Sequence, residues 1–121
     1  MSDESLPILL VEDDPLVLDS TALLLADGGC DVRRASNVAE ALALLSEGPL
    51  PAVIVTDIRL ADDASGLDLA RTVAERWPQV KLLIVSGEQR PGPEDYPQGA
   101  LFFTKPYAQG ALLTMVKERA W

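Results

Sequence analysis

Four apolar runs in this chain end in polar residues that could do chemistry together. In chain order, these residues are Glu12 with Asp13, Asp57, Ser86 and Lys105. A carboxylate can attack a phosphorus atom, while an ammonium group and a hydroxyl can hold the phosphate oxygens. Such a set is the minimum needed to form an acyl phosphate on an aspartate, so we expect Asp57 to be the nucleophile.

The elements that must position these residues alternate between strands and helices, which predicts an α/β fold with a parallel sheet covered on both faces. The apolar runs predict strands at 6–11, 30–34, 53–56, 80–85 and 101–103. Helical periodicity predicts helices at 15–27, 37–48, 65–77 and 108–119. The flavodoxin-like strand order 2-1-3-4-5 is the topology we expect, and in that order the ends of strands one and three are neighbours.

Local signals fix several helix ends. Asp14 is a candidate N-cap before Pro15, and Asn37 is followed by Glu40 in capping-box position. Ser65 is the candidate cap of the third helix. For the first helix, helical spacing predicts an inward face made of Val17, Ser20, Thr21, Leu24 and Leu25.

Three carboxylates should converge at the ends of strands one and three. Such a cluster repels itself in a partly desolvated site and is stable when it holds a cation. Oxygen ligands in a chain without histidine favour Mg²⁺. We expect Asp13 and Asp57 to bind the ion directly and Glu12 to act through a water. The backbone carbonyl near Arg59 is a further candidate ligand.

Composition limits the class of protein. At 121 residues we expect a single domain, residues 1–121, acting as a monomer or weak dimer. A net charge of −9 argues against binding to nucleic acid or to an anionic membrane surface. The single Cys30 and the acidic start without a signal peptide predict a cytoplasmic location.

Four motifs together carry a resemblance that covers nearly the whole chain. They lie at residues 8–14, 55–57, 84–87 and 103–107. On these residues the chain resembles a response-regulator receiver domain of the CheY-like kind. The resemblance implies that Asp57 accepts a phosphoryl group from a phosphohistidine on a histidine kinase or histidine phosphotransfer protein. It implies Mg²⁺ at Glu12, Asp13 and Asp57, a switch role for Ser86, and pairing of Lys105 with the phosphorylated aspartate.

The chain departs from the family pattern in three places. The switch aromatic, often tyrosine, is Phe102 here, so a switch at this position would work by packing alone. The loop after Asp57 lacks the frequent proline and is one residue longer, which resembles stand-alone receivers or those of hybrid kinases. Prolines at 91, 93 and 97 predict that the fourth helix is short or missing.

Three functions remain to be compared. The first is a phosphorylatable receiver that acts as a stand-alone shuttle, sink or switch and is not an enzyme beyond its own phosphorylation and dephosphorylation. The second is a pseudo-receiver, a protein-interaction module that phosphorylation does not regulate. The third, an aspartyl-phosphate hydrolase, needs an acid-base residue two positions after the nucleophile, where this chain has Arg59.

The partner of a receiver should dock around the crevice. Candidate docking residues are Asp14, Pro15, Pro106 and Tyr107. For Tyr107, local packing at the start of the last helix is an equally good explanation.

Overall fold

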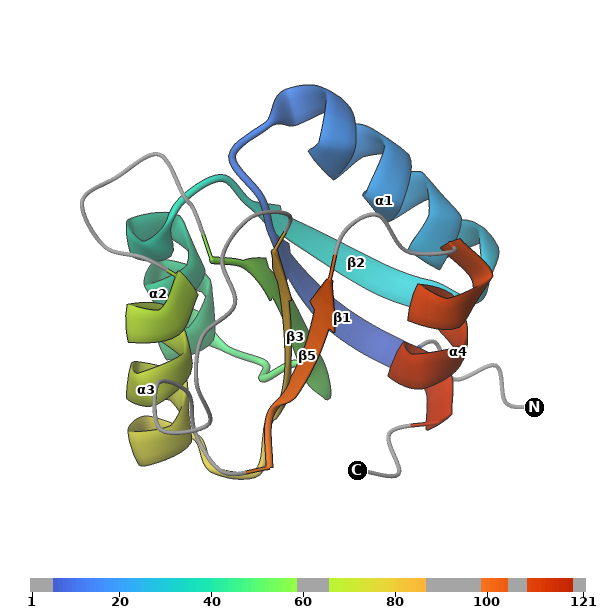
Figure 1. The fold of residues 1–121 in the computed structure, drawn as a ribbon. Helices are drawn as coiled ribbons and strands as arrows, with labels where there is room; N and C mark the ends of the chain where they lie inside the picture. Colours follow the sequence, from blue (N-terminus) through green and yellow to red (C-terminus); the bar gives the residue numbers. More distant parts are fainter. Residues whose placement is uncertain (1–5, 59–65, 87–98, 105–108, 119–121) are drawn as a thin grey trace.

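A computed structural model describes residues 6–58, 66–86, 99–104 and 109–118. Five parallel strands form one sheet in the order β2-β1-β3-β4-β5, with helices on both faces (Figure 1). The strands are β1 Leu6–Val11, β2 Cys30–Ala35, β3 Val53–Asp57, β4 Lys81–Ser86 and β5 Leu101–Thr104. The helices are α1 Pro15–Asp27, α2 Val38–Glu47, α3 Gly66–Arg76 and α4 Gln109–Glu118.

The predicted flavodoxin-like fold is confirmed, strand order included. The helix expected at the end of the chain is α4, which packs beside α1. The expectation of a short or missing helix between β4 and β5 falls on residues 87–98, outside the described part. Among the helices that the structure describes, none is long and apolar enough to cross a membrane.

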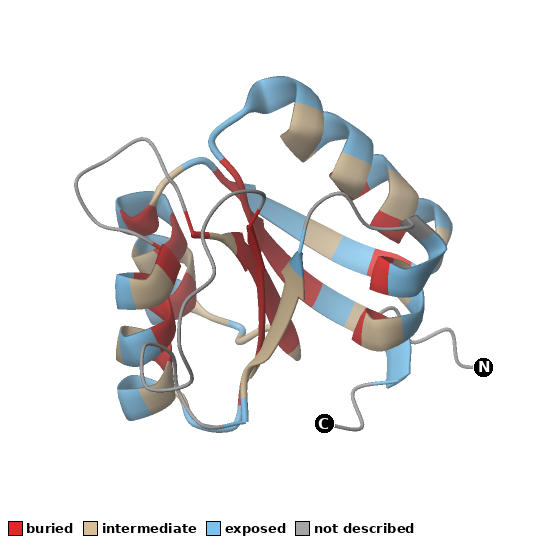
Figure 2. Ribbon diagram, viewed as in Figure 1, coloured by how far each residue is buried: buried red, intermediate tan, exposed pale blue. Residues whose placement is uncertain are grey.

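Alternation along the strands divides the core into two layers, because successive side chains point to opposite faces of a sheet. On β1, Leu9 and Val11 pack with α2 and α3, whereas Ile8 and Leu10 pack with α1 and α4. On β3, Ile54 lies in the first layer. Figure 2 shows the buried strands between the two pairs of helices. β1, β3 and β4 are apolar on both faces, which explains their uninterrupted runs of apolar residues.

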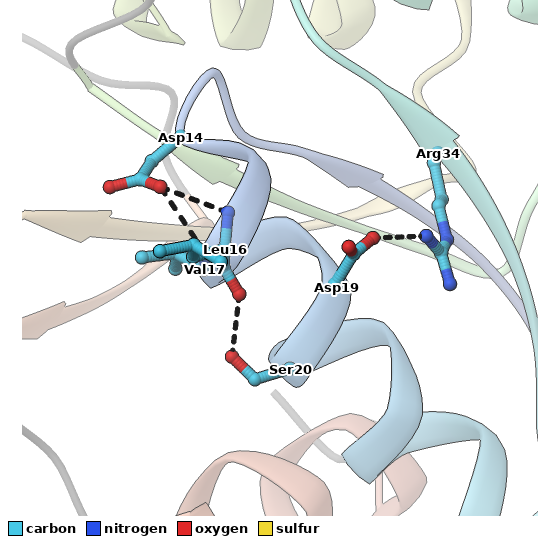
Figure 3. A network of polar contacts seen from close by, with 6 residues as sticks. All are labelled: Asp14, Leu16, Val17, Asp19, Ser20 and Arg34. Atoms are coloured by element: carbon cyan, nitrogen blue, oxygen red, sulfur yellow. Dashed lines mark hydrogen bonds and ion pairs between the residues drawn. The ribbon is translucent and has the colours of Figure 1, made fainter.

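The predicted cap of α1 is confirmed, and its predicted inward face is partly wrong. Asp14 Oδ1 accepts hydrogen bonds from the backbone N–H groups of Leu16, at 3.0 Å, and Val17 (Figure 3). Ala22 is buried instead of Ser20, which is exposed. The Ser20 hydroxyl donates to the Leu16 carbonyl of its own helix at 2.8 Å, so this polar group is satisfied without contact to the core.

The capping box at α2 forms with a shift of one residue. Asn37 Oδ1 accepts from the Glu40 N–H at 2.8 Å, as predicted. The Glu40 carboxylate reaches back to the N–H of Ser36 at 2.7 Å, one residue before the cap. Both bonds fix the entry into α2, which leaves the sheet edge at β2.

Candidate functional site

The strand register brings the predicted acidic residues to one edge of the sheet. Val11 pairs with Thr56, so Glu12 and Asp57 follow at the same level on the neighbouring strands β1 and β3. Asp57 itself pairs with Val85 on the other side, one residue before Ser86. The carboxyl ends of the three central strands of the sheet therefore meet where ligands bind in open α/β sheets.

Glu12 is buried, with 6% of its surface exposed, and its position is fixed by its neighbours. Its backbone N–H donates to the Ala35 carbonyl on β2 at 3.0 Å. Its carboxylate Oε2 accepts the Asp14 N–H at 3.2 Å, across the turn that leads into α1. Asp13 lies between them and is exposed. The turn thus holds one carboxylate inside the protein and presents the next to solvent.

Asp57 is half-buried, and the backbone around it is held tightly. The Thr56 hydroxyl donates to the Asp57 carbonyl oxygen at 2.9 Å. The Ile58 N–H donates to the Val85 carbonyl at 3.1 Å, and the Gly66 N–H donates to the Ile58 carbonyl at 2.8 Å. Sequence reasoning missed Thr56 and Gly66 as supports of the site. The Thr56 bond lies within β3, and the Gly66 contacts join the end of β3 to the start of α3.

The remaining predicted residues divide into described and undescribed ones. Ser86 is 1% exposed at the end of β4 and pairs in register with Thr104. Phe102, the predicted packing switch, is half-buried and packs on the core layer formed with α2 and α3. The other predicted site residues lie outside the described part, and they are Arg59, Lys105, Pro106 and Tyr107.

The donors present fit Mg²⁺ better than a metal that needs a complete protein cage. Within the described residues, no three Asp, Glu, Cys or His side chains are gathered closely enough to hold a metal ion, so the predicted convergence of three carboxylates is not observed. Mg²⁺ commonly takes one or two protein carboxylates and fills its other positions with water and phosphate oxygens. Exposed Asp13 and half-buried Asp57 suit that pattern.

Glu12, Asp13 and Asp14 form the turn before α1, which we call the acidic turn. Beside it, α1 exposes two large apolar side chains. Leu16 is 79% exposed and Leu23 is 57% exposed. Their spacing of seven residues, two helical turns, brings them to the same side of the helix, away from the face that covers the sheet. Asp14 and Pro15 are exposed next to Leu16. The spacing of these leucines was visible in the sequence, but their exposure depends on how α1 packs.

A comparison with protein families identifies the family of this chain. The model of the response regulator receiver domain matches residues 8–117. The chain belongs to this family.

Relatives with sequence similarity are regulators that are longer than this receiver. The phyllosphere-induced regulator PhyR of Methylorubrum extorquens is 28% identical over 97% of this chain and 44% of its own length. The response regulator protein PilR of Pseudomonas aeruginosa is 34% identical over 89% of this chain and 24% of its own length. The chain thus spans less than half the length of these curated relatives.

Solved structures of receivers match the fold along nearly the full chain. A response regulator receiver protein from Sinorhizobium medicae has a TM-score of 0.85 at 28% identity and covers 97% of this chain and 95% of its own. A CheY-like receiver domain protein from Methanospirillum hungatei has a TM-score of 0.82 at 29% identity, covering 96% and 94%.

Proposed function

We propose that this receiver accepts a phosphoryl group on Asp57 from a phosphohistidine of a histidine kinase or histidine phosphotransfer protein. The observation that carries the proposal is the family match over residues 8–117, combined with Asp57 at the end of the central strand β3. Glu12, one residue past β1 and at the level of Asp57, supports it, since acidic residues at that point suit a cation-assisted transfer.

In the proposed reaction, a carboxylate oxygen of Asp57 attacks the phosphorus atom. The P–N bond of the donor breaks, and its electron pair returns to the imidazole ring, which takes up a proton. The product is an acyl phosphate on Asp57 and a free histidine on the partner. Lys105 and Ser86 are the proposed partners of the phosphate oxygens, as an ammonium and a hydroxyl donor respectively.

Mg²⁺ is the proposed cofactor, and when bound it neutralises charge on the phosphoryl oxygens. Asp13 and Asp57 would hold the ion directly, Glu12 would act through a water, and the carbonyl near Arg59 is the further candidate. The burial of Glu12 and its bond to the Asp14 N–H support the indirect role, because part of its carboxylate is already engaged.

The partner is proposed to dock on α1 beside the acidic turn. Leu16 and Leu23 offer apolar surface that the core does not use, and Asp14 and Pro15 border it. An exposed apolar pair rimmed by charge suits a helical partner with an apolar stripe. The protein is proposed to work in the cytoplasm as a shuttle, sink or switch, without turning over a separate substrate.

The test is to incubate the protein with acetyl phosphate and Mg²⁺ and to measure its mass. We expect the gain of one phosphoryl group, lost in Asp57→Asn and lost on chelation with EDTA. No gain in the wild type would favour the pseudo-receiver, a module that binds partners without phosphorylation. A gain that persists in Asp57→Asn would place the acceptor elsewhere, and rapid turnover of unrelated phosphoesters would favour the hydrolase.

A further inference from the structure

One peptide group at the site, the one that joins Asp57 to Ile58, has both of its polar atoms bonded. Its carbonyl oxygen accepts the Thr56 hydroxyl at 2.9 Å, and its N–H donates to the Val85 carbonyl on β4 at 3.1 Å. The backbone of Gly66 at the start of α3 also packs against the same carbonyl. The tilt of this peptide group is therefore fixed by three separate elements of the chain.

The tilt of this group matters because it is coupled to the Asp57 side chain through the backbone angle ψ of Asp57. Since the peptide N–H is bonded to β4, a change in ψ alters how the Asp57 Cα and its side chain are oriented relative to β4. The same rotation redirects the chain after Ile58. The N–H bond to β4 continues the ladder of the sheet, but the bond to the carbonyl comes from a side chain.

Thr56 is the residue that supplies this extra bond. It is fully buried, with 0% of its surface exposed. Valine would have the same branched shape and a strong preference for strands, and it would bring no polar group that needs a partner. The hydroxyl is thus what threonine adds at this position, and its acceptor is the carbonyl of the phosphoacceptor.

We propose that Thr56 is a positioning residue for phosphoryl transfer, acting through the Asp57 carbonyl without touching the phosphoryl donor. This inference rests on the proposed function of Asp57. The test compares Thr56→Val, which removes the hydroxyl, with Thr56→Ser, which keeps it. The matched control is Thr72→Val, because the Thr72 hydroxyl also bonds a backbone carbonyl, that of Asp68 at 3.1 Å, but on α3.

The measurement is the rate constant of mass gain with acetyl phosphate and Mg²⁺, divided by the folded fraction from urea unfolding. Since a displaced reacting group costs transfer rate steeply, we expect Thr56→Val to be slower by about tenfold. Thr56→Ser should recover the rate to within about twofold, because the donor is restored. Thr72→Val should react like the wild type.

The outcomes separate this inference from the function on which it rests. No mass gain in the wild type overturns the proposed function and this inference with it. Mass gain in the wild type at a rate that Thr56→Val matches overturns the positioning role alone. Equal slowing in Thr56→Val and Thr56→Ser also overturns it, because packing and not the hydroxyl would then be responsible.

Discussion

Gly66→Ala is the substitution for which the structure makes the sharpest prediction. A Cβ atom at Gly66 would overlap the Asp57 carbonyl oxygen, and it would lie 2.8 Å from the Asp57 carbonyl carbon and 3.0 Å from the Ile58 Cα. All three atoms belong to the backbone, so no side chain can rotate away. Either the start of α3 or the end of β3 must move.

The expected change in the free energy of unfolding on Gly66→Ala is the balance of two opposing effects. Forcing an extra group into a packed site costs about 1–3 kcal/mol, and a contact with backbone belongs at the upper end of that range. Replacing glycine by alanine in a helix returns up to about 1 kcal/mol, and less at the first residue, where the helix is only half formed. We therefore expect Gly66→Ala to lower the free energy of unfolding by about 2 kcal/mol, since the clash outweighs the gain in helix propensity.

The assay is urea unfolding, and the control is Gly110→Ala on α4. A Cβ at Gly110 meets nothing within 4 Å, so the same exchange should there be neutral or stabilising, by up to about 1 kcal/mol. Gly66→Ala should also slow phosphorylation of Asp57, whose backbone it displaces. A Gly66→Ala protein at least as stable as the wild type would refute the reasoning.

Three further predictions concern the surface, the buried thiol and the metal. Leu16→Ser, and to a lesser degree Leu23→Ser, should slow phosphotransfer from a phosphorylated histidine phosphotransfer protein and leave the reaction with acetyl phosphate unchanged. If the variants and the wild type accept phosphate from the protein donor at equal rates, the partner does not dock on α1. Burial raises the pKa of the Cys30 thiol above its ordinary value of 9.0, and the Lys117 ammonium offsets part of that rise. Because the folded state then holds the thiol proton more tightly, this contribution to stability is complete below pH 9.0 and is lost as the pH rises further. Iodoacetamide should therefore alkylate Cys30 only at a pH higher than an ordinary thiol needs. Lys117→Met should shift this pH profile further upward, and an unshifted profile would contradict the effect of Lys117 on the thiol pKa. Removal of Mg²⁺ should abolish phosphorylation of Asp57 without unfolding the protein, as monitored by circular dichroism; phosphorylation at an undiminished rate in EDTA would exclude the ion.

The α/β class could be predicted because the strands are short, apolar and separated by helices with clear start signals; the strand order was expected from the flavodoxin-like topology and is confirmed. Asp14 before Pro15 and Asn37 before α2 are local signals, since the groups that they bond lie within a few residues. The inward face of α1 was predicted less well. Which side of a helix is buried depends on its packing angle against the sheet, and Ala22, not Ser20, meets the core.

That Glu12 and Asp57 follow at the same level of neighbouring strands could also be predicted, because parallel strands in a known order bring their ends to one edge. The contacts of Thr56 and Gly66 with the Asp57 carbonyl could not be predicted. Gly66 follows Asp57 by nine positions, and its backbone contact with the Asp57 carbonyl depends on where α3 begins. Thr56 reads in the sequence as one more strand residue, and only its bond to the Asp57 carbonyl distinguishes it from valine.

By itself, the sequence determined the α/β class and the acidic residues at the strand ends, because hydrophobic periodicity and residue chemistry act along the chain. The tertiary structure decided which of those residues are buried, that Glu12 is held by the turn, and that α1 leaves Leu16 and Leu23 exposed. Apart from the local bond between Glu12 and the Asp14 N–H, these features depend on contacts between segments distant in sequence. Their geometry is set by the packing of two helix layers on one twisted sheet.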